Sequence, residues 1–137
     1  MYPPDLVAPM KEELTSVGFS ELTSASDVDT ALNKEDGTVL LVINSVCGCA
    51  AANARPAVKM AVGHTKKPEA LTTVFAGVDQ EATAQARKHM LPYPPSSPSI
   101  ALFKNGRLVH FIERHHIEGR PAEMIAENLT SAFDEFC

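Results

Sequence analysis

The chain of 137 residues lacks several features that would assign it to a broad class of protein. No apolar run approaches the roughly 20 residues that a membrane-spanning helix needs. The N-terminal residues do not combine a basic region with an apolar stretch, so we expect no signal peptide. There is no basic run and the net charge at pH 7 is -5, which argues against nucleic acid as a partner. We therefore expect a cytoplasmic protein with no membrane segment.

The sequence also contains no linker, internal repeat or low-complexity tract. Its length, with 45% hydrophobic and 21% charged residues, is enough for one hydrophobic core, and we expect a single domain over residues 1–137. Cysteine is scarce, with three residues: Cys47, Cys49 and Cys137. Because structural disulfides are rare in the cytosol, a close cysteine pair there is more often catalytic or metal-binding.

Cys47 and Cys49 flank Gly48 where a predicted strand gives way to a predicted helix. Backbone N–H groups at a helix N-terminus have no intrahelical partners, and the helix dipole favours negative charge there. A cysteine at this position loses its proton more readily, and the thiolate is the nucleophile in disulfide exchange. The motif predicts a redox dithiol in which Cys47 has the lower pKa and Cys49 resolves mixed disulfides.

Two other interpretations of the pair are open. Cysteine can pack in a core as a small apolar residue. Two thiolates can also supply half of a zinc or copper(I) sphere, which would make the chain a metal-binding module or metallochaperone. No second Cys or His pair has the spacing of a structural zinc site, however, and the adjacent His115 and His116 suit chelation poorly. We place these histidines on a surface turn and assign no metal ligand.

The apolar pattern predicts helices and strands in alternation. Helices are expected at residues 6–17, 24–35, 50–62, 79–90 and 121–136, with Ser24 as an N-cap and a kink at Pro56. Strands are expected at residues 19–23, 38–45, 72–77, 99–103 and 107–112, the last two joined by a hairpin at Asn105-Gly106. Strands separated by helices favour parallel pairing, and the hairpin adds antiparallel strands. We expect an α/β fold, a central mixed sheet flanked by helices on both faces.

This order of elements resembles the thioredoxin fold with an extra N-terminal helix. Thioredoxins carry their redox motif at such a strand-to-helix junction, opposite a cis-proline that Pro98 matches. The resemblance implies a cis Ser97–Pro98 bond and a substrate-binding role for Ser97 and Pro98, whose backbone can pair with an extended substrate. Thioredoxins have two residues between their cysteines. With Gly48 alone, a Cys47–Cys49 disulfide would close a ring about three backbone atoms smaller, more strained and more easily reduced.

A closer resemblance, over essentially the whole chain, is to the bacilliredoxins of bacteria. It is carried by residues 44–50, 55–57, 73–77, 95–99, 109–112 and 117–119 and by the terminal Cys137. The resemblance implies reduction of mixed disulfides between protein cysteines and bacillithiol, a low-molecular-weight thiol, with disulfide isomerase activity as a second activity. It makes Cys47 the attacking and Cys49 the resolving cysteine. S-thiolated proteins would be the substrates and the small thiol the co-substrate, with no other cofactor.

Arg55 and Cys137 receive no catalytic role from the sequence. Arg55 lies about two turns into the helix after the cysteines, too far to pair with the Cys47 thiolate, so we expect a salt bridge or a solvated position. Cys137 ends the chain, where mobility is common, and we expect a free thiol. The alternative for Cys137 is a regulatory or intermolecular partner.

Overall fold

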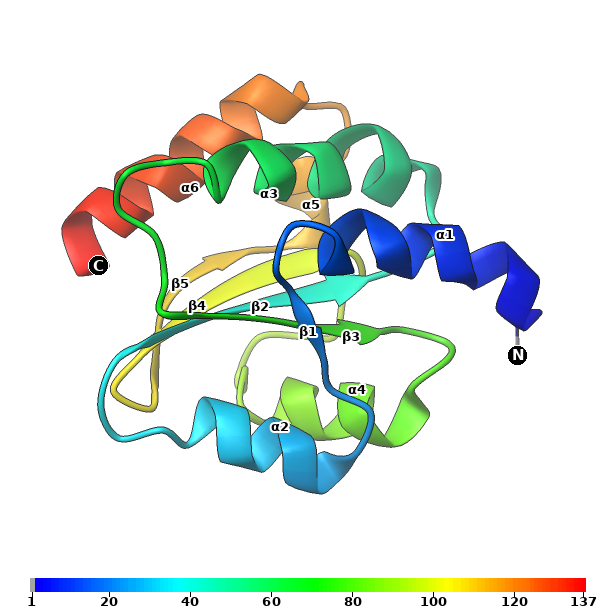
Figure 1. Ribbon diagram of the computed structural model, residues 1–137, viewed down its shortest axis with the longest axis horizontal. Helices are drawn as coiled ribbons and strands as arrows, with labels where there is room; N and C mark the ends of the chain where they lie inside the picture. Colours follow the sequence, from blue (N-terminus) through cyan, green and yellow to red (C-terminus); the bar gives the residue numbers. More distant parts are fainter. Residues whose placement is uncertain (1) are drawn as a thin grey trace.

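The β-branched and aliphatic run that begins at Thr38 becomes the middle strand of a five-stranded sheet (Figure 1). The computed structural model describes residues 2–137. The strands are β1 (Ser20–Glu21), β2 (Thr38–Asn44), β3 (Ala70–Phe75), β4 (Ser99–Lys104) and β5 (Arg107–Ile112). They lie in the order β1-β3-β2-β4-β5. β3 is parallel to β1 and β2, whereas β4 is antiparallel to β2 and β5, so the expected mixed sheet is confirmed.

Helices cover both faces of this sheet, as expected (Figure 1). One layer contains α1 (Pro4–Thr15), α3 (Arg55–Ala61), α5 (Arg114–Ile117) and α6 (Ala122–Phe136), and the other contains α2 (Ala25–Leu32) and α4 (Gln80–Lys88). All seven residues of β2 are buried, because its side chains alternate between the two layers. Leu40 and Val42 pack in the first core, whereas Leu41 and Ile43 pack in the second.

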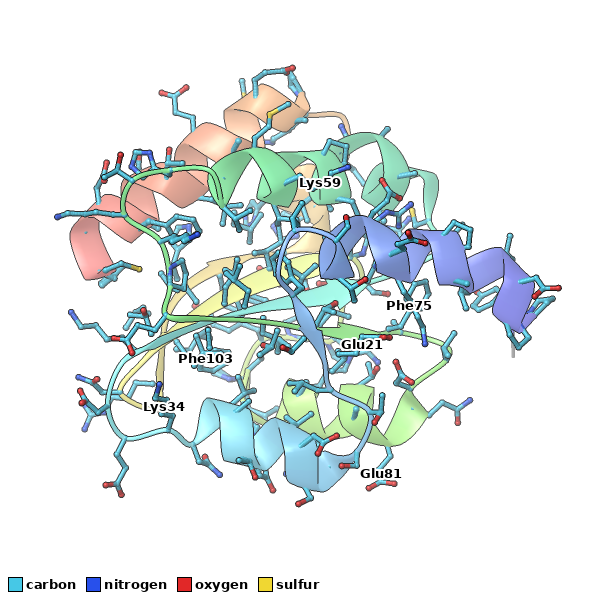
Figure 2. All side chains as sticks on the ribbon, in the orientation of Figure 1. Glu21, Lys34, Lys59, Phe75, Glu81 and Phe103 are labelled. Atoms are coloured by element: carbon cyan, nitrogen blue, oxygen red, sulfur yellow. The ribbon has the colours of Figure 1, made fainter. Side chains whose placement is uncertain are left out.

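Specific polar contacts fix the α2 and α4 layer. Ser24 is the expected N-cap, and its Oγ accepts a hydrogen bond from the Asp27 N–H at 3.1 Å. Glu81 of α4 accepts from the backbone N–H of Ala25, at the start of α2, at 3.1 Å (Figure 2). Phe103 of β4, also labelled in Figure 2, packs in the core between the sheet and these two helices. Hydrogen bonds at the start of α2, as well as burial of apolar side chains, therefore hold α2 and α4 in place.

The irregularity expected at Pro56 takes the form of a widened helical turn. Residues Ala50–Ala54 form a π-helical segment, η1, immediately before α3. The N–H of Arg55 donates to the carbonyl of Ala50, five residues back. Proline has no N–H and its ring crowds the carbonyl four residues before it, so an extra residue in the turn relieves the clash without ending the helix.

Other boundaries differ in detail from the sequence expectations. β3 begins at Ala70 and ends at Phe75, because the chain turns at Gly77, where φ is +85°. The short helix α5 replaces the surface turn expected after β5. The hairpin is confirmed, with positive φ at both Asn105 and Gly106. Within residues 2–137, no helix has the length and apolar character to cross a membrane.

Candidate active site

Cys47 and Cys49 lie just beyond the carboxyl end of β2, at the start of the helical segment that leads into η1 and α3. The Cys47 carbonyl accepts hydrogen bonds from the N–H groups of Ala50 and Ala51, at 3.0 and 3.3 Å. The Cys47 N–H donates to Ser45 Oγ at 2.9 Å. Both thiols are free and half-buried, with their Sγ atoms 2.7 Å apart. The expected junction between strand and helix is therefore present, and it brings the two thiols into contact.

The two thiols have opposite electrostatic environments. The Cys49 side chain donates a hydrogen bond that lowers the pKa of Cys47, and nearby backbone N–H groups and the positive charge of Arg114 lower it further, against an opposing effect of burial. Burial, followed by the hydrogen bond and charge of Cys47, raises the pKa of Cys49 to about 11. The expected order of acidity is confirmed. The pair favours a Cys47 thiolate held by a protonated Cys49.

Arg114, which the sequence analysis did not assign to the site, also contacts Cys47. Its Nη2 lies 3.3 Å from Cys47 Sγ, and its Nη1 donates to the Ser97 carbonyl at 3.2 Å. Nε donates to the Glu118 carboxylate, one helical turn further along the chain. Arg114 is therefore positioned by an acidic side chain and joins the thiol of Cys47 to the segment before Pro98.

Sheet register explains why Arg114 and Ser97 meet Cys47. β4 pairs with β2 so that Ser99 lies opposite Ile43, and β5 pairs with β4 so that Ile112 lies opposite Ile100. The segment before β4 and the segment after β5 consequently both end beside the exit of β2. Strand order alone would have placed Arg114 near Cys47, since it follows Ile112 by two residues.

The Ser97–Pro98 bond is cis, as expected, and so is Leu91–Pro92. One lone pair of the Ser97 carbonyl is already occupied by Arg114. The Ser97 carbonyl and Cys47 Sγ thus contact the same guanidinium, so Ser97 lies beside the dithiol, and its role in binding substrate stays a prediction. Gly48 leaves open space above the pair, because a Cβ built there meets no atom within 4 Å.

A buried polar network supports the other side of the junction. Arg55 is 2% exposed. Its Nε donates to Glu13 at 2.7 Å, and its Nη1 donates to Asn44 Oδ1 at 3.0 Å and to the Ser45 carbonyl at 2.9 Å. Asn44 in turn accepts from the Ser45 N–H and donates to the Met10 carbonyl. Of the two positions expected for Arg55, the salt bridge is therefore correct, and Arg55 fixes the two residues that lead to the cysteines.

The remaining residues singled out in the sequence lie away from the two thiols or serve local structure. Cys137 follows α6 and neighbours Thr38, which begins β2, so it lies at the opposite end of that strand from Cys47 (Figure 1). His115 and His116 belong to α5, where His116 Nδ1 accepts from the Glu113 N–H at 3.2 Å. Among residues 2–137, Glu113, His115 and His116 are the one group of three or more His, Cys, Asp or Glu residues whose potential metal-ligand atoms all lie within 4.8 Å of one another.

The sheet order, the dithiol after the central strand and the cis-proline beside it define a thioredoxin-fold protein with a redox dithiol. Solved structures share this fold. A putative oxidoreductase with a thioredoxin fold matches with a TM-score of 0.65 at 16% identity, covering 87% of this chain and 96% of that one. A thioredoxin of Malassezia sympodialis matches with a TM-score of 0.61 at 13% identity, covering 87% and 90%.

Sequence relatives are much closer. A family described as Disulphide isomerase matches residues 2–137. The chain is 61% identical to a bacilliredoxin of Cytophaga hutchinsonii, over 98% of this chain and 99% of the relative. It is 50% identical to a bacilliredoxin of Halalkalibacterium halodurans, over 99% and 94%. The chain belongs to this family, the bacilliredoxins, and is an oxidoreductase with the thioredoxin fold.

Proposed function

We propose that this protein reduces mixed disulfides between protein cysteines and a low-molecular-weight thiol, bacillithiol in hosts that make it. The observation that carries the proposal is the unequal pair: a Cys47 thiol with a lowered pKa in contact with a Cys49 thiol whose pKa is about 11. Reduction of a mixed disulfide by a dithiol needs one thiolate that attacks and a second thiol that stays protonated until the intermediate forms and then resolves it.

The first step is attack by the Cys47 thiolate on the small-thiol sulfur of the mixed disulfide. The bond between this sulfur and the protein sulfur breaks, a disulfide forms between Cys47 and the small thiol, and the protein leaves as a thiolate that takes up a proton. In the second step Cys49 loses its proton and attacks Cys47 Sγ. A Cys47–Cys49 disulfide forms, and the small thiol leaves as a thiolate that takes up a proton. Two molecules of an external thiol then supply two electrons and two protons, restore the dithiol and leave as their own disulfide.

Substrate would approach over Gly48 and the Ser97–Pro98 segment. The open space above Gly48 leaves room for a disulfide aligned with Cys47. The Ser97 backbone can pair with an extended stretch of the substrate protein, and Pro98 limits what else can approach the thiols. Arg114 supplies a positive charge beside the attacking sulfur and can offer a partner to an anionic small thiol. A cytoplasmic location is part of the proposal, because the dithiol must be kept reduced.

The metal-binding alternative is less favoured by the same contacts. Two thiolates can bind zinc or copper(I), but the Arg114 guanidinium lies 3.3 Å from Cys47 Sγ, where a metal cation bound to the pair would be repelled. The pair also shares one proton through its Sγ–Sγ contact, and a metal would have to displace it.

A trapping experiment tests the proposal. The substrate is a separate protein with a single cysteine that forms a mixed disulfide with bacillithiol. It is incubated with the reduced wild-type chain or with its Cys47→Ser, Cys49→Ser or Cys137→Ser variant, and intact masses are measured. We expect release of the small thiol by wild type and by Cys137→Ser, no reaction with Cys47→Ser, and a stable bacillithiol adduct on Cys49→Ser. An adduct on the Cys47→Ser protein, or none on Cys49→Ser, would contradict the assignment.

A second arm separates reductase from isomerase activity. A protein with scrambled disulfides and no small thiol attached is offered to the same variants. If Cys49→Ser retains most of the reshuffling rate but no longer releases the small thiol, Cys47 alone is enough for isomerisation and both cysteines are needed for reduction.

Anaerobic titration with zinc and copper(I) tests the metal-binding alternative. Tight binding of one metal per chain without turnover of the mixed disulfide would favour a metal-binding module.

A further inference from the structure

We propose that a second, unassigned site between β5 and α6 binds a small oxyanion, a carboxylate or phosphate attached to a short apolar group. A cavity of about 170 Å³ lies there, walled by the end of β5, by α5 and by the first two turns of α6. Arg114, which contacts Cys47, is not among the residues that line it. The site is therefore separate from the dithiol, and the proposal goes beyond the proposed function.

Hydrogen bonds already made in the structure leave donors free on two residues that line this cavity. His116 Nδ1 accepts from the Glu113 N–H, so the neutral imidazole carries its proton on Nε2. Asn128 Oδ1 is occupied by His110 Nε2 at 2.6 Å, which leaves the Asn128 amide NH2 as its free group. A lining formed by an imidazole N–H and an amide NH2 offers donors to a ligand that must itself supply acceptors.

Arg120 adds the charge. It lines the same cavity, and within residues 2–137 its guanidinium has no hydrogen-bond or salt-bridge partner. Its backbone is held in place, because the Arg120 carbonyl accepts from the Asn53 side chain and its N–H donates to Ile117. A guanidinium on an anchored backbone, with its five donors unused, suits bidentate recognition of a planar carboxylate or of a phosphate.

The floor of the cavity is apolar and limits what accompanies the anion. Ile112 and Ile125 are 4% and 2% exposed and form its base, and Met124, half-exposed, lies at its side. A small hydrocarbon or aromatic group would bury against these side chains while its oxyanion meets Arg120. The groove that continues along α6 is lined by Glu127 and Glu135, so negative charge is favoured only at the α5 end.

Titration calorimetry with reduced wild-type protein tests this site, with benzoate, phenyl phosphate and inorganic phosphate as probes. We expect one ligand per chain for benzoate or phenyl phosphate, with a dissociation constant below about 1 mM, and weaker binding of inorganic phosphate, which has no apolar group. Whichever aromatic anion binds more tightly identifies the oxyanion. Absence of saturable binding by both aromatic anions would overturn the proposal.

Matched arginine variants locate the ligand. Arg120→Gln should weaken binding at least about tenfold while leaving disulfide turnover unchanged, and Arg120→Lys should recover part of the loss. Arg107→Gln removes the same charge from the exposed start of β5, outside the cavity, and should bind as wild type does. Equal loss in Arg107→Gln would indicate a nonspecific charge effect. Loss in Arg114→Gln but not in Arg120→Gln would place the anion at the dithiol. Either result overturns the proposal.

Discussion

Cysteines lie beyond both ends of β2, but only Cys47, beyond Asn44, has a lowered pKa. Beyond Asn44, Cys47 meets a donating thiol, backbone N–H groups and Arg114, and its pKa falls. At the Thr38 end, Cys137 is exposed at the end of the chain, yet burial of its sulfur raises its pKa, and a hydrogen bond with Thr38 and the nearby Lys104 offset this only in part. Exposure of a cysteine residue is therefore a poor guide to its reactivity, and donors around the sulfur are a better one.

The two ends also differ in how the chain is supported. Behind Cys47, an arginine that is 2% exposed binds the last strand residue and the one after it, so the strand exit is held by charge-assisted hydrogen bonds. At the opposite end, Lys34 and Glu69 form a salt bridge with half-exposed side chains, a kind of contact that contributes little. The dithiol therefore follows the end of the strand that a buried arginine holds.

Alkylation rates give the largest expected contrast. At pH 7, iodoacetamide should modify Cys47 faster than Cys49 or Cys137 by about one to two orders of magnitude, because only the thiolate reacts and only Cys47 has a lowered pKa. The Cys47 rate should level off once the pH exceeds its pKa, while the Cys49 rate should rise until the pH is near 11. Peptide mapping after limiting reagent measures this, and preferential labelling of Cys137 would reverse the comparison.

Arg55→Met should give the next largest effect, on stability. The substitution keeps most of the apolar stem but leaves Glu13 and the buried Ser45 carbonyl without their shared partner. Loss of one member of a largely buried charged pair costs about 3 kcal/mol of unfolding free energy, and urea denaturation followed by circular dichroism can measure it. Arg107→Met, at an exposed position of β5, is the matched control and should change stability by less than about 0.5 kcal/mol. Equal losses would mean that the network does not stabilise the junction.

Much of the fold and of the dithiol could be predicted from the sequence, but the contacts of the arginines that support the dithiol could not. The apolar run at residues 38–44, the Asn105-Gly106 turn and the Cys pair identify β2, the β4–β5 hairpin and the dithiol, because these signals are local. Arg114 and Arg55 act through contacts 67 and 42 residues away in the chain, which local pattern cannot reveal. The π-helical turn before Pro56 was also missed, since a proline in a helix is compatible with a kink as well as with a widened turn.

Arg114→Gln should have a smaller effect on the dithiol than loss of either cysteine. Glutamine keeps much of the side-chain length but removes the positive charge, so the pKa of Cys47 should rise and its pH–rate curve should move to higher pH. The shift is modest, because the Cys49 hydrogen bond remains as the larger influence and Arg114 is exposed to solvent. We expect alkylation of Cys47 at pH 7 to slow about threefold, with Arg114→Lys close to wild type. A faster reaction in Arg114→Gln would contradict the role given to this charge.

Cys137→Ser should have the smallest effect on disulfide turnover, and it tests the cysteine beyond the Thr38 end of β2. Cys137 neighbours Thr38 and Lys104 and has no contact with the dithiol, so turnover of a mixed disulfide should stay within about twofold of wild type. The variant should also lose one of the two thiols that alkylate slowly at pH 7, while Cys49 remains slow and Cys47 keeps its fast labelling. Mild oxidation followed by a non-reducing gel adds a second measurement, because covalent dimers should form only through Cys137, while Cys47 and Cys49 react within one chain. If turnover falls severalfold in Cys137→Ser, this terminal thiol takes part in exchange, and the alternative role as a redox partner replaces that of a free thiol.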